Sequence, residues 1–222
     1  MTSTSAARLW HTVTALAAAA GLGTQLVLVV TGASVLVEDR PPGLAARLLH
    51  FVSYFTVLSN LLVLLTTAAA ARRPTVDGRL WRVLRLDAVV GITVTGLVHW
   101  FFLRPLLQLT GWPYVTDKVL HVVVPLLAVV GWLLVGPRPR ITLRVVLLGL
   151  IYPVGWLVYT LVIGAATGWY PYPFIDVGAR GGAAVAVTSV ALALLILAFS
   201  VLAWLADRRW PPTPRDLPTG RP

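Results

Sequence analysis

The sequence predicts an all-α integral membrane protein, a bundle of six transmembrane helices with both termini in the cytoplasm. Of the 222 residues, 58% are hydrophobic and only 12% are charged, about half the charged share of an ordinary soluble domain. The mean hydropathy is +0.83. The apolar residues form six segments that short polar loops separate. A membrane-spanning helix needs about 20 apolar residues, so each segment has room to cross a bilayer.

The six apolar segments fill the chain up to residue 209. The first is too long for the core of a signal peptide, so we interpret it as a retained span. Residues 1–209 are therefore predicted to form one transmembrane domain, and the Pro-rich residues 210–222 a disordered cytoplasmic tail. The segments are 9–37, 48–71, 86–109, 119–135, 141–166 and 182–206.

The distribution of positive charge predicts the orientation. A net charge of +10 is compatible with nucleic-acid binding, but the charges lie in short loops, which is typical of a topology signal. Thirteen of the 18 Arg and Lys residues fall on the side of the two termini and five on the other side. We therefore expect a multi-pass protein of the cell membrane with no nucleic-acid partner. The chain has no cysteine, which excludes disulfides and thiolate metal sites.

An ionisable pair opens the fourth apolar segment. Asp117 and His121 are four residues apart, so they share one face of a helix. Pro125 cannot donate the helical hydrogen bond to the His121 carbonyl, which frees that acceptor and bends the helix. Ionisable groups are costly in lipid and mark functional sites by default. In the simpler interpretation Asp117 is a helix N-cap and Pro125 only a kink.

Polar side chains of the second and third segments are predicted to lie near this pair. Ser53, Thr56 and Asn60 follow one stripe of the second segment. His99, on the third segment, comes to a similar level in the outer half of the membrane. Simpler roles exist for each: a Thr hydroxyl bonded to the preceding turn, an Asn bridging two helices, and a His that only packs.

Together these groups supply the parts of a nucleophilic catalyst. Thr56 is the candidate nucleophile, His121 its base and Asp117 the group that orients the imidazole. Asn60 or a free backbone N–H would stabilise an oxyanion. The rigid aromatic segment 168–174, GWYPYPF, is expected to cover the outer mouth of the bundle or to anchor at the interface. The candidate substrate-binding residues are Asn60, His99, Ser53, Tyr170 and Tyr172.

Three other functions remain open from the residues alone. A non-enzymatic lipid or small-molecule carrier would use the same polar cavity, although the spans are expected to be largely continuous, unlike those of most carriers. His99 and His121 would suffice as axial ligands of one haem. His99, His121 and Asp117 would suffice for a zinc ion. We expect an enzyme without metal or cofactor.

Three motifs resemble those of the bacterial "Pr-six-Pr" membrane proteins, which look related to the eukaryotic androgen-induced and androgen-dependent membrane proteins. They are FTVLSN at 55–60, DxxxHxxxP at 117–125 and YPYPFID at 170–176. The resemblance extends over the second to the sixth segment. It implies a transmembrane threonine hydrolase that cleaves fatty-acid esters of hydroxy fatty acids, with Thr56 as nucleophile and His121 as base. A lipid-like substrate would enter from the bilayer.

Overall fold

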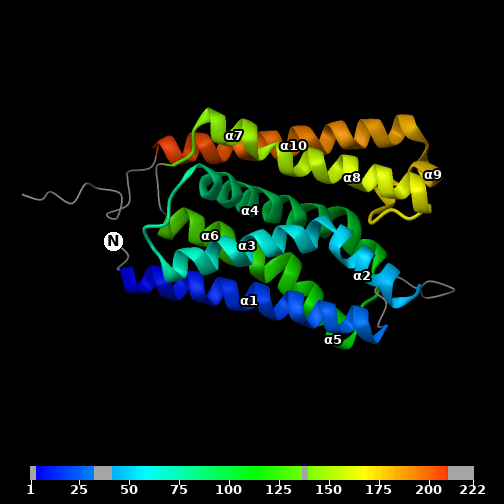
Figure 1. Ribbon diagram of the computed structural model, residues 1–222, viewed down its shortest axis with the longest axis horizontal. Helices are drawn as coiled ribbons and strands as arrows, with labels where there is room; N and C mark the ends of the chain where they lie inside the picture. Colours follow the sequence, from blue (N-terminus) through cyan, green and yellow to red (C-terminus); the bar gives the residue numbers. More distant parts are fainter. Residues whose placement is uncertain (1–3, 33–41, 137–139, 210–222) are drawn as a thin grey trace, which may run out of the picture.

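A computed structural model describes residues 4–32, 42–136 and 140–209 of the chain (Figure 1). All regular secondary structure in these ranges is helical. The predicted tail at 210–222 lies outside the described residues. The helices are α1 (Thr4–Thr31), α2 (Leu44–Ser53), α3 (Phe55–Arg72), α4 (Arg79–Val98), η1 (His99–Leu103), η2 (Arg104–Leu106), α5 (Gly111–Lys118), η3 (Val119–Val123), α6 (Val124–Val135), α7 (Leu143–Gly149), α8 (Ile151–Thr167), η4 (Pro173–Ile175), α9 (Val177–Arg180) and α10 (Gly182–Arg209).

Six helical stretches of the described chain are long and apolar enough to cross a membrane, which confirms the predicted six-helix bundle. The first and last described residues lie at the same end of the bundle (Figure 1). We call the opposite end the distal end. The cytoplasmic location of the termini stays a prediction. The spans are Ser5–Thr31, Phe55–Arg72, Arg79–Leu106, Gly111–Val135, Leu143–Thr167 and Gly182–Arg209.

The second span is interrupted, so the prediction of a continuous helix over 48–71 is wrong. Helix α2 ends at Ser53, Tyr54 is extended (φ −69°, ψ 126°), and α3 begins at Phe55. Neither proline nor glycine lies at the break. Side chains from elsewhere hold it: Trp156 Nε1 donates to the Ser53 carbonyl at 2.9 Å, and Thr56 N donates to Tyr172 Oη at 3.2 Å. These bonds satisfy backbone groups that a continuous helix would pair internally.

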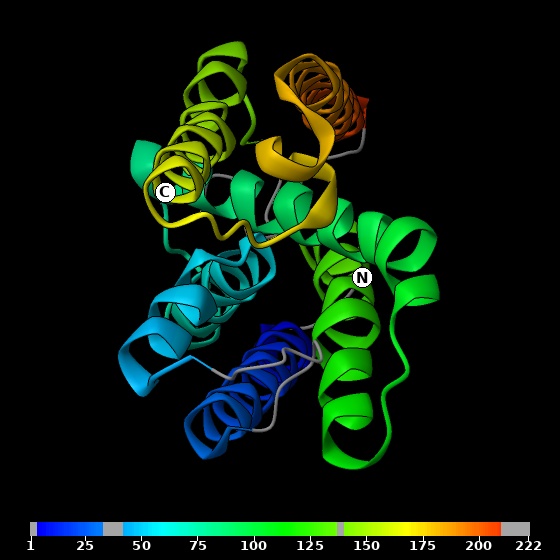
Figure 2. The same ribbon diagram turned by 90° about the vertical axis from the view of Figure 1, so that its right-hand side faces the viewer.

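Helix α4 is the central element of the bundle. It is the most buried of the six spans, whereas α10 is the least buried. It packs against α3, α6, α7 and α10. Viewed from the distal end, α1 and α3 lie on one side of the molecule and α8 and α10 on the other (Figure 2). The buried residues of α4 lie mainly between Arg85 and Thr95, so this part of the helix forms the centre of the bundle.

Two short π-helical turns adjoin each other at the distal half of the bundle. One continues α4 as η1 and begins with His99, and the other joins α5 to α6 as η3 and contains His121. Gly96 allows them to approach, since a Cβ at this position would lie 3.2 Å from the His121 carbonyl oxygen and 3.4 Å from the Pro125 ring. Such π-turns are frequent at functional sites.

Charged residues connect the loops at the end that holds the termini. Asp77 lies 2.6 Å from Arg82 and 3.0 Å from Arg140. Asp207 of α10 accepts hydrogen bonds from the backbone N–H groups of Arg140 and Ile141, at 2.6 and 2.8 Å. The hydrogen bond from Arg82 holds the pKa of Asp77 well below its ordinary value, so this carboxylate stays charged in mild acid. The cluster fixes the ends of the spans far from the polar residues described next.

Candidate active site

Thr56 lies in the first turn of α3, directly after the break in the second span. The first N–H groups of a helix have no intrahelical acceptor, and the helix dipole makes this end electropositive. The Thr56 N–H is accordingly bonded to a side chain, the Tyr172 hydroxyl, at 3.2 Å. The Thr56 side chain therefore sits beside backbone donors that favour a developing negative charge.

The Thr56 hydroxyl contacts the imidazole of His121. Thr56 Oγ1 is 3.3 Å from His121 Nε2. On the other side of the ring, His121 Nδ1 lies 3.0 Å from the Asp117 carbonyl and 3.1 Å from Asp117 Oδ1. Both are acceptors, so Nδ1 carries the proton of the neutral imidazole. Nε2 then has a free lone pair directed at the Thr56 hydroxyl, which is the arrangement required of a base.

Asp117 is not a helix N-cap, so that interpretation is wrong. Helix α5 begins at Gly111, with Thr110 at the N-cap position, and Asp117 lies in its last turn. Its carboxylate receives Lys118 Nζ at 2.7 Å and lies 3.3 Å from His99 Nε2. Lys118 was not among the predicted site residues. Its signal is its position beside Asp117, because a carboxylate inside a membrane needs a nearby positive charge.

His99 stacks on His121. The ring centroids are 3.8 Å apart and the planes differ by 16°. Together with Asp117, the two histidines bring three possible metal-ligand atoms within 4.8 Å of one another. A histidine lone pair lies in the ring plane, however, so two nearly parallel stacked rings do not direct both lone pairs at one ion. Rings in face-to-face contact also leave no space between them for a macrocycle. This arrangement favours a hydrogen-bonded cluster over a zinc or haem site.

Three predicted site residues lie apart from the Thr56 side chain. Both amide protons of Asn60 are bonded, to the carbonyls of Thr56 (2.9 Å) and Leu120 (3.3 Å), so Asn60 connects two spans and has no proton left for an oxyanion. Ser53 Oγ donates to the Leu49 carbonyl at 2.7 Å and contacts Tyr159. The Tyr170 ring packs on Gly164, where no Cβ would fit. Ser53 lies apart from Thr56 because the helix breaks at Tyr54 between them. The prediction that they share one stripe assumed a continuous helix.

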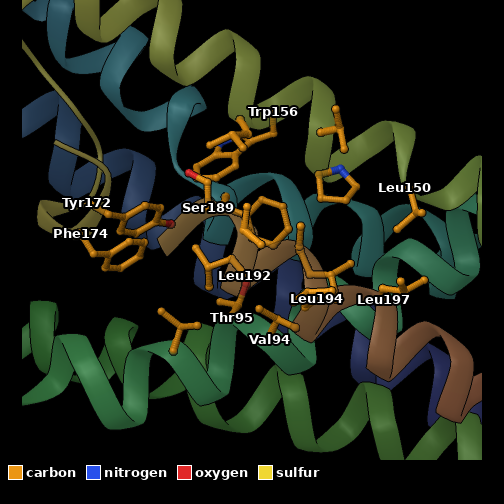
Figure 3. A pocket seen from close by; sticks show the side chains of 18 of the residues that line it. Val94, Thr95, Leu150, Trp156, Tyr172, Phe174, Ser189, Leu192, Leu194 and Leu197 are labelled. Atoms are coloured by element: carbon orange, nitrogen blue, oxygen red, sulfur yellow. The ribbon is translucent and has the colours of Figure 1, made fainter. Parts of the chain in front are cut away.

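Two cavities meet at Thr56, and their linings were not predictable from the sequence. The distal cavity, about 230 Å³, is lined mostly by apolar side chains, but its walls also hold polar and charged residues that include Gln25, Arg47, His50, His99, Asp117 and His121. The lateral cavity, about 270 Å³, lies between α4, α8 and α10 and is lined almost entirely by apolar side chains (Figure 3). Three residues line both cavities: Thr56, Leu103 and Tyr172.

Tyr172 is the aromatic residue of the 168–174 segment that reaches the site. Its hydroxyl lies 3.3 Å from Thr56 Oγ1. Its ring stacks on Phe174 (5.2 Å between centroids) and meets Tyr54 edge to face (5.7 Å). Burial raises the pKa of the Tyr172 phenol, against the opposing effect of its contact with Thr56. The phenol is therefore protonated at neutral pH and available as a donor.

The fold and its six apolar spans define a multi-pass integral membrane protein. Comparison of the chain with protein-family models, with curated proteins and with solved structures finds no match.

Proposed function

We propose that the protein is an intramembrane threonine hydrolase that cleaves an ester of a lipid-like acyl substrate through an acyl-Thr56 intermediate. The observation that carries the proposal is the 3.3 Å contact between Thr56 Oγ1 and His121 Nε2. Its support is the protonated Nδ1 beside Asp117 and the position of Thr56 in the wall of both cavities. Nucleophile, base and orienting carboxylate are thus within reach of one another.

Acylation begins when His121 Nε2 takes the proton of the Thr56 hydroxyl. Oγ1 attacks the ester carbonyl, and the carbonyl oxygen becomes an oxyanion. The Thr56 N–H, which donates to Tyr172 Oη in the structure, would donate to this oxyanion instead. The Tyr172 hydroxyl would donate to the oxyanion as well. The bond to the alcohol oxygen then breaks, and the alcohol leaves with the proton from His121.

Deacylation reverses these roles with water as the nucleophile. His121 Nε2 takes a proton from a water molecule, the hydroxide attacks the acyl carbonyl, and the same donors stabilise the second oxyanion. The bond between the acyl carbon and Thr56 Oγ1 breaks, and Oγ1 recovers its proton from His121. The free acid is released and the enzyme is restored.

The proposal extends to family and orientation. We place the chain with the transmembrane threonine hydrolases that its FTVLSN, DxxxHxxxP and YPYPFID segments resemble. We also propose that it lies in the cell membrane with both termini in the cytoplasm, in agreement with the excess of Arg on that side. The site would then open toward the outer face of the membrane, and membrane lipids would be the source of substrate.

The proposal predicts a covalent adduct on one residue. Purified protein in lipid nanodiscs, incubated with a dodecyl fluorophosphonate, is expected to form one phosphonate ester, on Thr56, because the hydroxyl beside His121 is the activated one. Peptide mass spectrometry identifies the site. Heat-denatured protein is the control and should not react. An adduct on another hydroxyl, or none on the folded protein, contradicts the proposal.

Replacement of Tyr172 by Phe tests the second oxyanion donor. Loss of one oxyanion donor typically lowers kcat by about 10²- to 10³-fold. We expect a smaller fall in kcat for ester hydrolysis, about 10- to 100-fold, because the Thr56 N–H remains as a donor. The control is Tyr170→Phe, whose ring lies in the same segment but packs on Gly164, and which should keep its activity. Equal activity of Tyr172→Phe and wild type would remove Tyr172 from the mechanism.

One observation favours a second candidate, a lipid carrier. The interrupted second span is typical of transport proteins, whose binding sites often lie at broken helices. A carrier would move a lipid between leaflets of a liposome without forming an adduct, and Thr56→Ala would leave that flux unchanged. The close contact of Thr56 with His121 has no use in such a carrier, so we favour the hydrolase.

A further inference from the structure

We infer that the substrate is divided at Thr56, with its acyl chain in the lateral cavity and its alcohol part in the distal cavity. The inference rests on the proposed hydrolase and assigns the substrate class: an ester of a long aliphatic acid with a polar alcohol. The position of Thr56 supports this division of the substrate. Thr56 lines both cavities, and the scissile bond must lie at its hydroxyl.

The position of the base decides which part goes where. The leaving alcohol must accept its proton from His121 Nε2, so the alcohol oxygen must lie on the His121 side of the ester carbonyl. His121 and Asp117 line the distal cavity, and neither lines the lateral one. The alcohol therefore leaves through the distal cavity, and water enters by the same route. The acyl chain must occupy the other side of Thr56.

The lateral cavity has the shape and walls of an acyl-chain site. It runs from Tyr172 and Phe174 toward Leu150 and Leu197 (Figure 3). Along α10 it reaches from Ser189 to Leu197, which is about 12 Å at the helical rise. Val154 of α8 and Leu194 of α10 line it and are 52% and 60% exposed. The cavity thus reaches the lipid-facing surface between these helices, where an acyl chain would enter from the bilayer.

The distal cavity has mostly apolar walls, but it carries more polar groups than the lateral cavity, so of the two it is the one that can bind a polar alcohol. Gln25, Arg47 and His50 line it together with the catalytic groups. Arg47 Nη1 donates to the Val29 carbonyl at 2.9 Å, while the buried Nε has no hydrogen-bond partner within the described part of the chain. A buried donor of this kind is costly when unpaired, so an oxygen-bearing group in this cavity would be favoured over a second aliphatic chain.

The test fills each cavity separately and measures labelling of Thr56. Ala193, on α10, lines the lateral cavity, and Ala191 on the same helix is exposed and lies outside both linings. We expect Ala193→Trp to slow labelling by dodecyl fluorophosphonate about tenfold or more. Labelling by a second probe, an ethyl fluorophosphonate, should stay within about twofold of wild type, because only the long chain meets the indole. Ala191→Trp should leave both rates unchanged.

A second variant fills the distal cavity. Leu107→Trp should leave dodecyl labelling within about twofold, since fluoride is a small leaving group, but slow hydrolysis of a glyceryl laurate about tenfold. Thermal unfolding reports whether each variant is folded. The assignment is overturned if Ala193→Trp slows both probes equally, or if Leu107→Trp and not Ala193→Trp slows the dodecyl probe. Wild-type protein with no adduct on Thr56 would instead overturn the proposed function itself.

Discussion

Replacement of Thr56 by Ala is expected to lower kcat for ester hydrolysis by about 10⁵-fold or more, because among the described residues no other hydroxyl is hydrogen-bonded to His121 Nε2 and able to form the acyl intermediate. Tyr172 Oη is an adjacent hydroxyl, at 3.3 Å from Thr56 Oγ1. Its protonated phenol contacts Thr56, and within the described residues His121 Nε2 is bonded to Thr56 alone. Steady-state hydrolysis of a lauroyl ester in nanodiscs measures the effect.

Thr56→Ser is the matched control for this substitution. It retains a hydroxyl at the same position and loses one methyl group, so it should recover activity to within about 100-fold of wild type. Thr67→Ala serves as a control for loss of a buried threonine elsewhere in α3, since Thr67 Oγ1 donates to carbonyls of its own helix, those of Val63 at 2.6 Å and Leu64 at 3.4 Å. If Thr56→Ala and Thr67→Ala reduce activity alike, Thr56 has only a structural role.

Asp117→Asn is expected to reduce kcat by about 10³-fold with little change in KM. Loss of an orienting carboxylate costs about 10⁴-fold where it alone fixes the base. Here the Asp117 carbonyl also accepts from His121 Nδ1, at 3.0 Å, so part of the ring orientation survives. The remaining loss reflects the missing negative charge next to the imidazolium that forms in the transition state. The measurement is the ratio of kcat to that of the wild type at saturating ester.

Asp87→Asn controls for the removal of a buried carboxylate. Asp87 and Asp117 are both 7% exposed, and Asp87 lines neither of the two cavities. It should keep kcat within about threefold of wild type, because loss of a group outside the site leaves transition-state stabilisation intact. Similar losses in the two variants, with lower thermal stability in both, would show that Asp117 only holds the fold together.

The six spans were predictable because a membrane crossing depends on one property, a run of about 20 apolar residues. The bounds of the spans were less predictable. Helix α4 begins at Arg79, in a charged stretch that the prediction treated as part of a loop. The break at Tyr54 was not predictable, since it depends on Trp156 and Tyr172, which are distant in sequence. A local pattern carries no information about such partners.

The candidate site was partly accessible from the sequence for a similar reason. The i, i+4 spacing of Asp117 and His121 is a local property and fixes their relative placement. The contact of His121 with Thr56 joins two spans 65 residues apart, so residue types alone could nominate the pair but not its distance. Ser53 was misplaced by the assumption of an unbroken helix. The two cavities depend on packing of four or more helices and left no trace in the sequence.

The two π-turns have a consequence for how such a site arises. A π-turn corresponds to one residue inserted into an α-helix, and one residue rotates everything beyond it by about 100°. The turns at His99–Leu103 and Val119–Val123 therefore each change which side chains of an otherwise regular span face the interior of the bundle. A chain one residue shorter in each turn would keep its length of hydrophobic helix and cross the membrane equally well. Its histidines would face different neighbours, so the bundle would persist while the chemistry was lost.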